Sequence, residues 1–162
     1  MKTVLLMRHA KSDWGAQYAT DFERPLNARG QRDAPVMAAF LASHKLLPKI
    51  IVSSPAQRAK STAEFVARER DFTGELRFDR RIYLASAPML IDVIRELPDS
   101  AEKAMLVGHN PGMEDLLMLL CGGNVRMPTA AIAGLRLYAD VWQDVSGGDA
   151  YLQWLIKPKL LR

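Results

Sequence analysis

Short apolar runs of strand length alternate along this chain with longer stretches in which apolar residues recur at helical spacing. The first run, residues 3–7, is apolar almost throughout, as expected of a strand that is covered on both faces of a sheet. The alternation predicts a three-layer α/β/α sandwich, with a mainly parallel central sheet and antiparallel strands at the C-terminal end. The predicted strands are 3–7, 49–53, 75–78, 103–108, 131–138 and 151–156, and the predicted helices are 30–47, 56–69, 87–97 and 113–120.

Three of these elements carry finer predictions. The run 75–78 alternates apolar and polar residues, which favours a place near an edge of the sheet. Ser54 and Pro55 are typical of a helix start, with Ser as the cap and Pro in the first turn. Residues 146–149, Ser-Gly-Gly-Asp, predict a hairpin turn between the last two strands.

The length of 162 residues suits one hydrophobic core, and no linker, repeat or low-complexity segment divides the chain. We therefore expect a single domain over residues 1–162. No apolar run approaches the ~20 residues that span a bilayer, and the N-terminal run meets Arg8-His9 too early for a signal peptide. Because Cys121 is the only cysteine, no intramolecular disulfide can form, and we expect a reducing compartment, the cytoplasm.

The chain is basic, with a formal net charge of +4 and a pI near 9.4. Its densest basic groups, residues 68–70 and 77–81, are both interrupted by carboxylates. No basic stripe with interleaved aromatic residues is present, so nucleic acid is not an expected partner. The modest positive excess is typical of a solvated surface and is compatible with a phosphorylated substrate.

Polar residues that can bind an anion follow three of the predicted strands. Because ligands bind at the carboxyl ends of parallel strands, these side chains are expected to meet at one edge of the sheet. Guanidinium groups there would form charge-assisted hydrogen bonds to a phosphoryl group. The residues are Arg8 and His9 after the first strand, Arg58 in the helix after the second, and His109 after the fourth.

Other chemistries are less well supported. Two histidines with no cysteine or carboxylate at ligand spacing make a weak metal site, and no metal or organic cofactor is expected. The glycine-rich motifs of dinucleotide and P-loop sites are missing, as is the Gly-x-Ser-x-Gly of α/β-hydrolases. Cys121 follows an apolar helix and is interpreted as a packing residue.

Three motifs in this chain resemble the histidine phosphatase superfamily, which has a phosphoglycerate mutase-like fold. They are Leu-Met-Arg-His-Ala at 6–10, Ser-Pro-Ala-Gln-Arg-Ala-Lys-Ser-Thr-Ala at 54–63, and Val-Gly-His-Asn-Pro at 107–111. The segments 8–14 and 21–30 are most similar to the short SixA-type phosphohistidine phosphatases. The motifs occur in the family's order and span most of the chain.

The resemblance implies a role for each matched residue. His9 would attack phosphorus and form a phosphohistidine intermediate, with its other ring nitrogen donating to a carbonyl or carboxylate. Arg8, Arg58 and His109 would neutralise the charge on the phosphoryl oxygens. Arg24 and Asp21 are further candidates for substrate or phosphate binding, Asp21 by orienting Arg24, although a loop ion pair explains them equally well.

Two departures from the family pattern matter for function. Ala10 replaces the glycine that follows the nucleophile, so it should have ordinary backbone dihedrals. The stretch 82–87 contains no carboxylate where many relatives place a glutamic acid that protonates the leaving group. A missing general acid costs a factor of about 10²–10⁴ in rate, and esters would suffer most.

The expected function is therefore that of a phosphatase whose substrate is phosphohistidine on a partner protein, or another phosphate with a good leaving group. Two alternatives remain open at this point. One is a small-molecule phosphomonoesterase that uses Asp13, Asp21 or another loop carboxylate as the acid. The other is a catalytically silent phosphate-binding protein.

Overall fold

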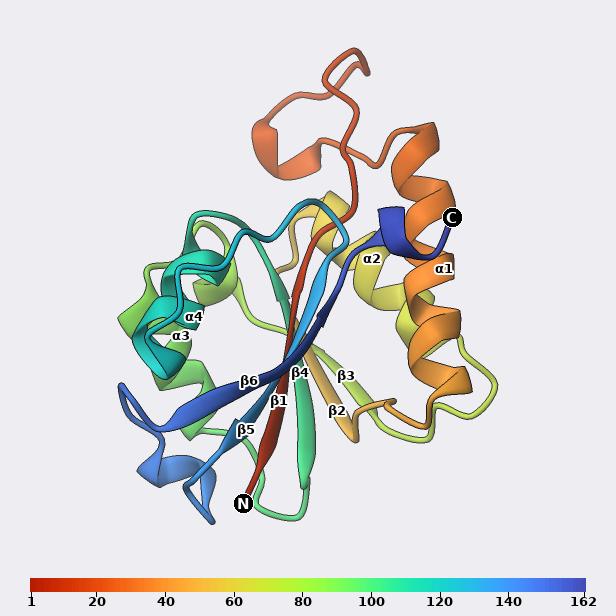
Figure 1. Cartoon of the computed structure of the whole chain (residues 1–162). Helices are drawn as coiled ribbons and strands as arrows, with labels where there is room; N and C mark the ends of the chain where they lie inside the picture. The colour runs from red at the N-terminus through yellow and green to blue at the C-terminus, as the bar shows by residue number, and fades with distance from the viewer.

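A six-stranded sheet runs through the middle of the molecule, and helices cover both of its faces (Figure 1). The computed structural model describes all residues, 1–162. The strands are β1 (Thr3–Arg8), β2 (Ile50–Ser53), β3 (Glu75–Phe78), β4 (Lys103–Gly108), β5 (Ile132–Leu137) and β6 (Ala150–Ile156). The helices are α1 (Ala28–Ser43), α2 (Gln57–Ala67), α3 (Ala87–Arg95) and α4 (Gly112–Cys121), with short 3-10 turns η1 (Asp21–Glu23), η2 (Arg80–Ile82), η3 (Trp142–Asp144) and η4 (Pro158–Leu160).

The strand order is β3-β2-β4-β1-β5-β6. Strands β1 to β4 are parallel, whereas β5 runs antiparallel to β1 and β6 antiparallel to β5. The predicted fold class, a mainly parallel sheet with antiparallel strands at the C-terminal end, is therefore confirmed. The predicted edge position of β3 is also confirmed.

The two faces of the sheet bury different helices, as the period of two in a strand requires. On β1, Leu5 and Met7 pack with the apolar residues of α1 and α2, and Val4 and Leu6 pack with those of α3 and α4. These side chains are fully buried. The result is the predicted helix–sheet–helix layering, in which β1 lies at the centre and is covered on both faces.

The register of the parallel strands brings their carboxyl ends level. Arg8 at the end of β1 lies opposite Gly108 at the end of β4, and Ser53 at the end of β2 lies opposite Val107. The pairing continues one residue further, because the N–H of His9 donates to the Gly108 carbonyl at 3.0 Å. Residues that follow these three strands therefore start from neighbouring positions.

The start of α2 differs from the prediction. The helix begins at Gln57 and its N-cap is Ala56, with no side-chain cap, so the prediction that Ser54 caps it is wrong. The Ser54 hydroxyl instead accepts from the N–H of Ala56 at 3.2 Å and lies 2.8 Å from a ring nitrogen of His109. This hydroxyl therefore belongs to the site, not to the helix end.

The predicted turn at 146–149 is present, with the N–H of Asp149 donating to the Ser146 carbonyl at 3.3 Å, but the connection between β5 and β6 is longer than this turn. It spans residues 138–149 and contains η3. Trp142 in η3 is fully buried, and its indole N–H donates to the Ala101 carbonyl at 2.9 Å. Because this indole packs beside the segment before β4, the chain makes a detour between the two strands. None of the helices combines the length and apolar composition that crossing a bilayer requires.

Candidate active site

A cavity of about 410 Å³ opens at the carboxyl ends of β1 and β4. Its lining is strongly basic, with three arginines and Lys11 against a single carboxylate. The structure brings all six site residues predicted from the sequence to this cavity, although they come from four separate segments. The six are Arg8, His9, Asp21, Arg24, Arg58 and His109.

His9 follows β1 directly and is buried, with 7% of its surface exposed. Its Nδ1 lies 2.7 Å from the carbonyl oxygen of Ala10, and a carbonyl can only accept. This contact assigns the ring proton to Nδ1 and leaves the lone pair on Nε2. Burial lowers the pKa of His9 to about 3, so the imidazole is neutral near pH 7.

The backbone beside His9 is tied to α2. The N–H of Ala10 donates to Thr62 Oγ1 at 3.0 Å, and this hydroxyl donates to the Arg58 carbonyl at 2.7 Å. Ala10 is fully buried and is not among the residues with positive φ, as predicted for an alanine in place of glycine. The loop after β1 is thus fixed to the helix that carries Arg58.

Arg8 is held by the loop that precedes β5. Its Nη1 donates to the Met127 carbonyl at 3.0 Å, and the Asn110 side-chain amide donates to the same oxygen at 3.0 Å. The N–H of Met127 in turn donates to the carboxylate of Glu114 at 2.7 Å. Partial burial lowers the pKa of Arg8, and the nearby Glu114 acts in the opposite direction.

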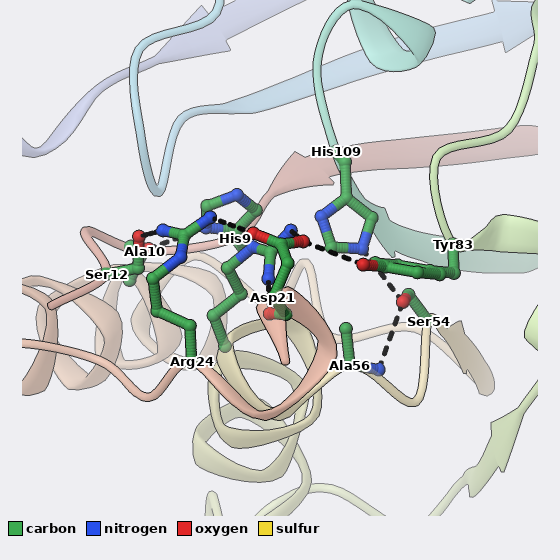
Figure 2. A network of polar contacts seen from close by, with 10 residues as sticks. His9, Ala10, Ser12, Asp21, Arg24, Ser54, Ala56, Tyr83 and His109 are labelled. Carbon is green, nitrogen blue, oxygen red and sulfur yellow. Dashed lines mark hydrogen bonds and ion pairs between the residues drawn. The ribbon is translucent and has the colours of Figure 1, made fainter. Parts of the chain in front are cut away.

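His109 follows β4, and its ring centroid lies 5.1 Å from that of His9. Ser54 Oγ already accepts from the N–H of Ala56, so its own proton is available to Nε2 of His109 at 2.8 Å. This arrangement assigns the proton of the His109 ring to Nδ1, which lies on the side that faces His9 in Figure 2. Burial lowers the pKa of His109 to about 3, and the nearby Arg58 acts in the same direction.

Asp21 links the side chains of Arg24, Arg58 and Tyr83, and Figure 2 shows it between Arg24 and Tyr83. Arg58 donates to the Asp21 carbonyl at 2.8 Å and to Oδ2 at 3.0 Å, and Arg24 donates to Oδ1 at 2.9 Å. The hydroxyl of Tyr83 donates to Oδ2 at 2.7 Å. The hydrogen bond from Arg24 is the largest cause that holds the pKa of the Asp21 carboxyl well below its usual range. The group is therefore ionised and has no proton to give.

The segment between β1 and α1 forms the outer wall of the cavity. Ser12 pairs with Leu26 in an isolated antiparallel bridge, which brings the two ends of the segment together. Arg24 is buried, donates to the Ser12 hydroxyl and lies under Trp14, with its guanidinium carbon 3.6 Å from the ring centroid. Trp14 itself is 68% exposed. The wall is thus built on side-chain contacts around one buried cation.

The sequence did not predict several residues that line the cavity or contact its lining residues. Ser54 was open to detection, because it begins the motif that contains Arg58. Tyr83 lies in the stretch that lacks a carboxylate, and nothing in that stretch indicates that its ring packs edge-on to His109, with centroids 5.5 Å apart. Trp14 and Leu84 also line the cavity, and neither follows a strand of the sheet.

Four buried hydrogen-bond donors on cavity residues have no partner in the protein. Buried donors are almost always satisfied, so each unpaired one requires an explanation. These atoms are closed to solvent and do not themselves face the cavity, but the charges of the arginines that line it suit a group rich in acceptors and negative charge, such as a phosphoryl group. The atoms are Nε of Arg8, Arg24 and Arg58, and Nδ1 of His109.

Comparison with known proteins places these residues in a family context. The model of the histidine phosphatase superfamily (branch 1) matches residues 4–82. An uncharacterized protein of Mycobacterium tuberculosis is 30% identical over 90% of this chain and 96% of its own length. The chain therefore matches this relative over nearly its full length.

Solved structures agree with the sequence comparison. A putative phosphohistidine phosphatase SixA from Agrobacterium tumefaciens superposes with a TM-score of 0.83 and 27% identity, over 97% of this chain and 98% of its own. A putative phosphohistidine phosphatase SixA from Nakamurella multipartita superposes with a TM-score of 0.86 at 21% identity, over 97% and 96%. The resemblance to this family noted in the sequence is thereby confirmed.

Proposed function

The chain belongs to the histidine phosphatase superfamily and is a phosphatase, and we propose that it hydrolyses phosphohistidine on a partner protein through a covalent intermediate on His9. The observation that carries this proposal is the pairing of His9 Nδ1 with the Ala10 carbonyl, which directs the lone pair of a neutral imidazole to Nε2. The cations that line the same cavity support a phosphoryl group as the target.

In the first step Nε2 of His9 attacks phosphorus, and the bond between phosphorus and the substrate nitrogen breaks. The leaving imidazole takes a proton on its other ring nitrogen from water and departs neutral. The phosphorylated ring of His9 keeps its Nδ1 proton and gains positive charge, which the Ala10 carbonyl stabilises. Water then attacks phosphorus, and the bond between phosphorus and Nε2 breaks. The inorganic phosphate that leaves carries a proton of the attacking water.

The cations would act on the oxygens of the phosphoryl group. Arg8 and Arg58 bring full charges that water screens only in part, because Arg58 is buried and Arg8 is half-buried. His109 would donate through Nδ1, whose tautomer Ser54 selects. Such donors stabilise charge that develops in the transition state, because they are in place before the reaction begins.

The choice of substrate depends on the leaving-group side. The only carboxylate that lines the cavity is Asp21, which is ionised and accepts from Arg24, Arg58 and Tyr83. Burial and the bond to Asp21 raise the pKa of Tyr83, so its phenol is a poor acid as well. A phosphoramidate needs no such acid, because its leaving nitrogen base can be protonated from water. This favours phosphohistidine over a sugar phosphate.

Phosphate release from a phosphohistidine protein should be compared with release from a panel of phosphomonoesters. We expect kcat/KM to be at least about 10²-fold higher for phosphohistidine, which is the lower end of what a general acid contributes to ester cleavage. A clear preference for a sugar phosphate would support the small-molecule phosphomonoesterase instead. Binding of phosphate without turnover of any substrate would support the silent phosphate-binding protein.

The intermediate can be trapped separately by quenching the reaction with labelled substrate in alkali, where phosphohistidine persists. His9→Ala should give no labelled protein. His44→Ala is the matched control, because His44 is an exposed imidazole on the C-cap of α1 and is remote from the cavity. The cytoplasmic location and the absence of a cofactor stay predictions from the sequence.

A further inference from the structure

A second, smaller cavity lies beside the active site. It has a volume of about 170 Å³ and is formed by the first turn of α1, the loop before β5 and the C-terminal segment. Figure 1 shows η4 and the C-terminus packed along α1, on the side of the sheet where β1 ends. Four cations line this C-terminal basic cavity: Arg29, Lys157, Lys159 and Arg162.

The carboxylates of the protein neutralise only part of the positive charge of this cavity. Two of its cations are paired with Asp33, a carboxylate that is 1% exposed: Arg29 lies 3.4 Å and Arg162 3.1 Å from it. Lys157 and Lys159 make no ion pair and no side-chain hydrogen bond within the chain. Three of the last six residues are Lys or Arg, and none of their side chains is acidic.

The cavity is fixed relative to the nucleophile. Thr129 lines both cavities, and the next residue, Ala130, donates its N–H to the carbonyls of Arg8 and His9, both at 3.1 Å. On the other side, Lys157 follows β6, whose Ile156 pairs with Ile132 of β5. Both walls of the cavity are therefore attached by backbone hydrogen bonds to the sheet that carries the active site.

We propose that the C-terminal basic cavity binds an acidic side chain of the phosphorylated protein while that protein's phosphohistidine occupies the active site. This inference rests on the proposed function and names the kind of partner surface that it requires. The ion pairs with Asp33 show that the arginines of this cavity bind a carboxylate, and the two lysines without an ion pair can bind another. The partner surface should therefore carry Asp or Glu beside its phosphohistidine, since charge complementarity selects partners and speeds their encounter.

The test uses two phosphohistidine peptides of about fifteen residues, one with three Asp or Glu residues beside the phosphohistidine and one with Asn or Gln there. In Lys157→Ala/Lys159→Ala, kcat/KM for the acidic peptide should fall about ten-fold at low salt. Turnover of the neutral peptide and of phosphoramidate should not change. The ten-fold difference should shrink as ionic strength rises, because exposed charges are screened.

The matched control is Lys45→Ala/Lys49→Ala, which removes two exposed lysines near the amino end of β2. It should leave the turnover of both peptides unchanged. Equal loss in the two double variants, or equal effects on the two peptides, would overturn the inference. The inference would also be overturned if removing Lys157 and Lys159 lowered the turnover of a small bisphosphate and left that of the acidic peptide unchanged.

Binding of the unphosphorylated acidic peptide to His9→Ala protein keeps the two proposals apart. If the enzyme hydrolyses phosphoramidate but neither peptide, the proposal that its substrate is a phosphorylated protein is wrong. The affinity for the unphosphorylated peptide still tests whether the C-terminal basic cavity binds acidic side chains. We expect the acidic peptide to bind about ten-fold more weakly when Lys157 and Lys159 are also removed. An unchanged affinity would contradict the proposed docking site.

Discussion

The floor and the outer wall of the active-site cavity are built in different ways. On the floor, His9 and His109 directly follow neighbouring parallel strands, are buried, and are oriented by the Ala10 carbonyl and the Ser54 hydroxyl. The outer wall lies in the segment between β1 and α1, where Asp21 and Arg24 hold each other and the side chain of Asp21 is 42% exposed. Sheet register therefore fixes the floor, whereas ion pairs within a loop fix the wall. Floor residues should control the chemistry, and wall residues should tune binding.

The largest expected effect is on the floor. His9→Ala removes the nucleophile, so turnover of every substrate should fall to background. The protein should still fold, because the substitution leaves the bonds of Ala10 and Ser54 in place. Steady-state assays together with circular dichroism check both statements. Substantial residual turnover would mean that the phosphoryl group goes directly to water.

Arg58, a buried residue of α2, can be compared directly with Arg24 of the outer wall. Arg58→Ala removes a buried charge-assisted donor and should lower kcat by about 10²–10³-fold, as the loss of one preorganised donor does. Arg24→Ala should act mainly on KM, by about ten-fold, because Arg24 is bound to Ser12 and Asp21 within the wall. The measurement is a full kcat and KM determination for each variant. A larger kcat loss in Arg24→Ala would reverse the assignment.

The same contrast explains what could be predicted from the sequence. The apolar runs and their order specify the sheet, and Arg8, His9 and His109 were predictable because they come directly after strands. Arg58 was predictable from its place in the helix that follows the second strand, whereas Arg24 needed the family resemblance. Tyr83 and Trp14 could not be predicted, because contacts between loops bring them to the cavity.

The connection between β5 and β6 was predicted only in part, for a related reason. The tight turn forms at residues 146–149, but burial of Trp142 against the Ala101 carbonyl decides the path of the chain before that turn. Ser54 likewise has the side chain of a helix cap and is used by His109 instead. Local propensity loses to tertiary contacts at these positions.

The floor should also make stability depend on pH. Burial lowers the pKa of His9 and His109 from 6.5 to about 3, so the unfolded chain binds two protons below pH 6.5 that the folded protein does not. The free energy of unfolding should therefore decrease as the pH falls from 6.5 toward 3, by roughly 1 kcal/mol per histidine per pH unit.

Urea unfolding at pH 7, 6 and 5 measures this dependence. The variant His9→Asn/His109→Asn lacks both imidazoles and should show a flatter profile over the same range. If the two profiles have equal slopes, the buried histidines are not the cause, and other groups must take up the protons.

The smallest effect is expected from the wall. Asp21→Asn removes the one negative charge that lines the cavity and keeps a single side-chain oxygen, which can replace Oδ1 as acceptor from Arg24 or Oδ2 as acceptor from Arg58, but not both. Because Asp21 repels a phosphoryl dianion and competes for Arg58, inorganic phosphate should inhibit this variant at about three- to ten-fold lower concentration. Asp13→Asn is the matched control, since its carboxylate accepts only from the N–H of Gly15 and does not line the cavity. Weaker inhibition by phosphate in Asp21→Asn would show that Asp21 acts chiefly by holding Arg58 in place, and that the wall is as important to the phosphate site as the floor.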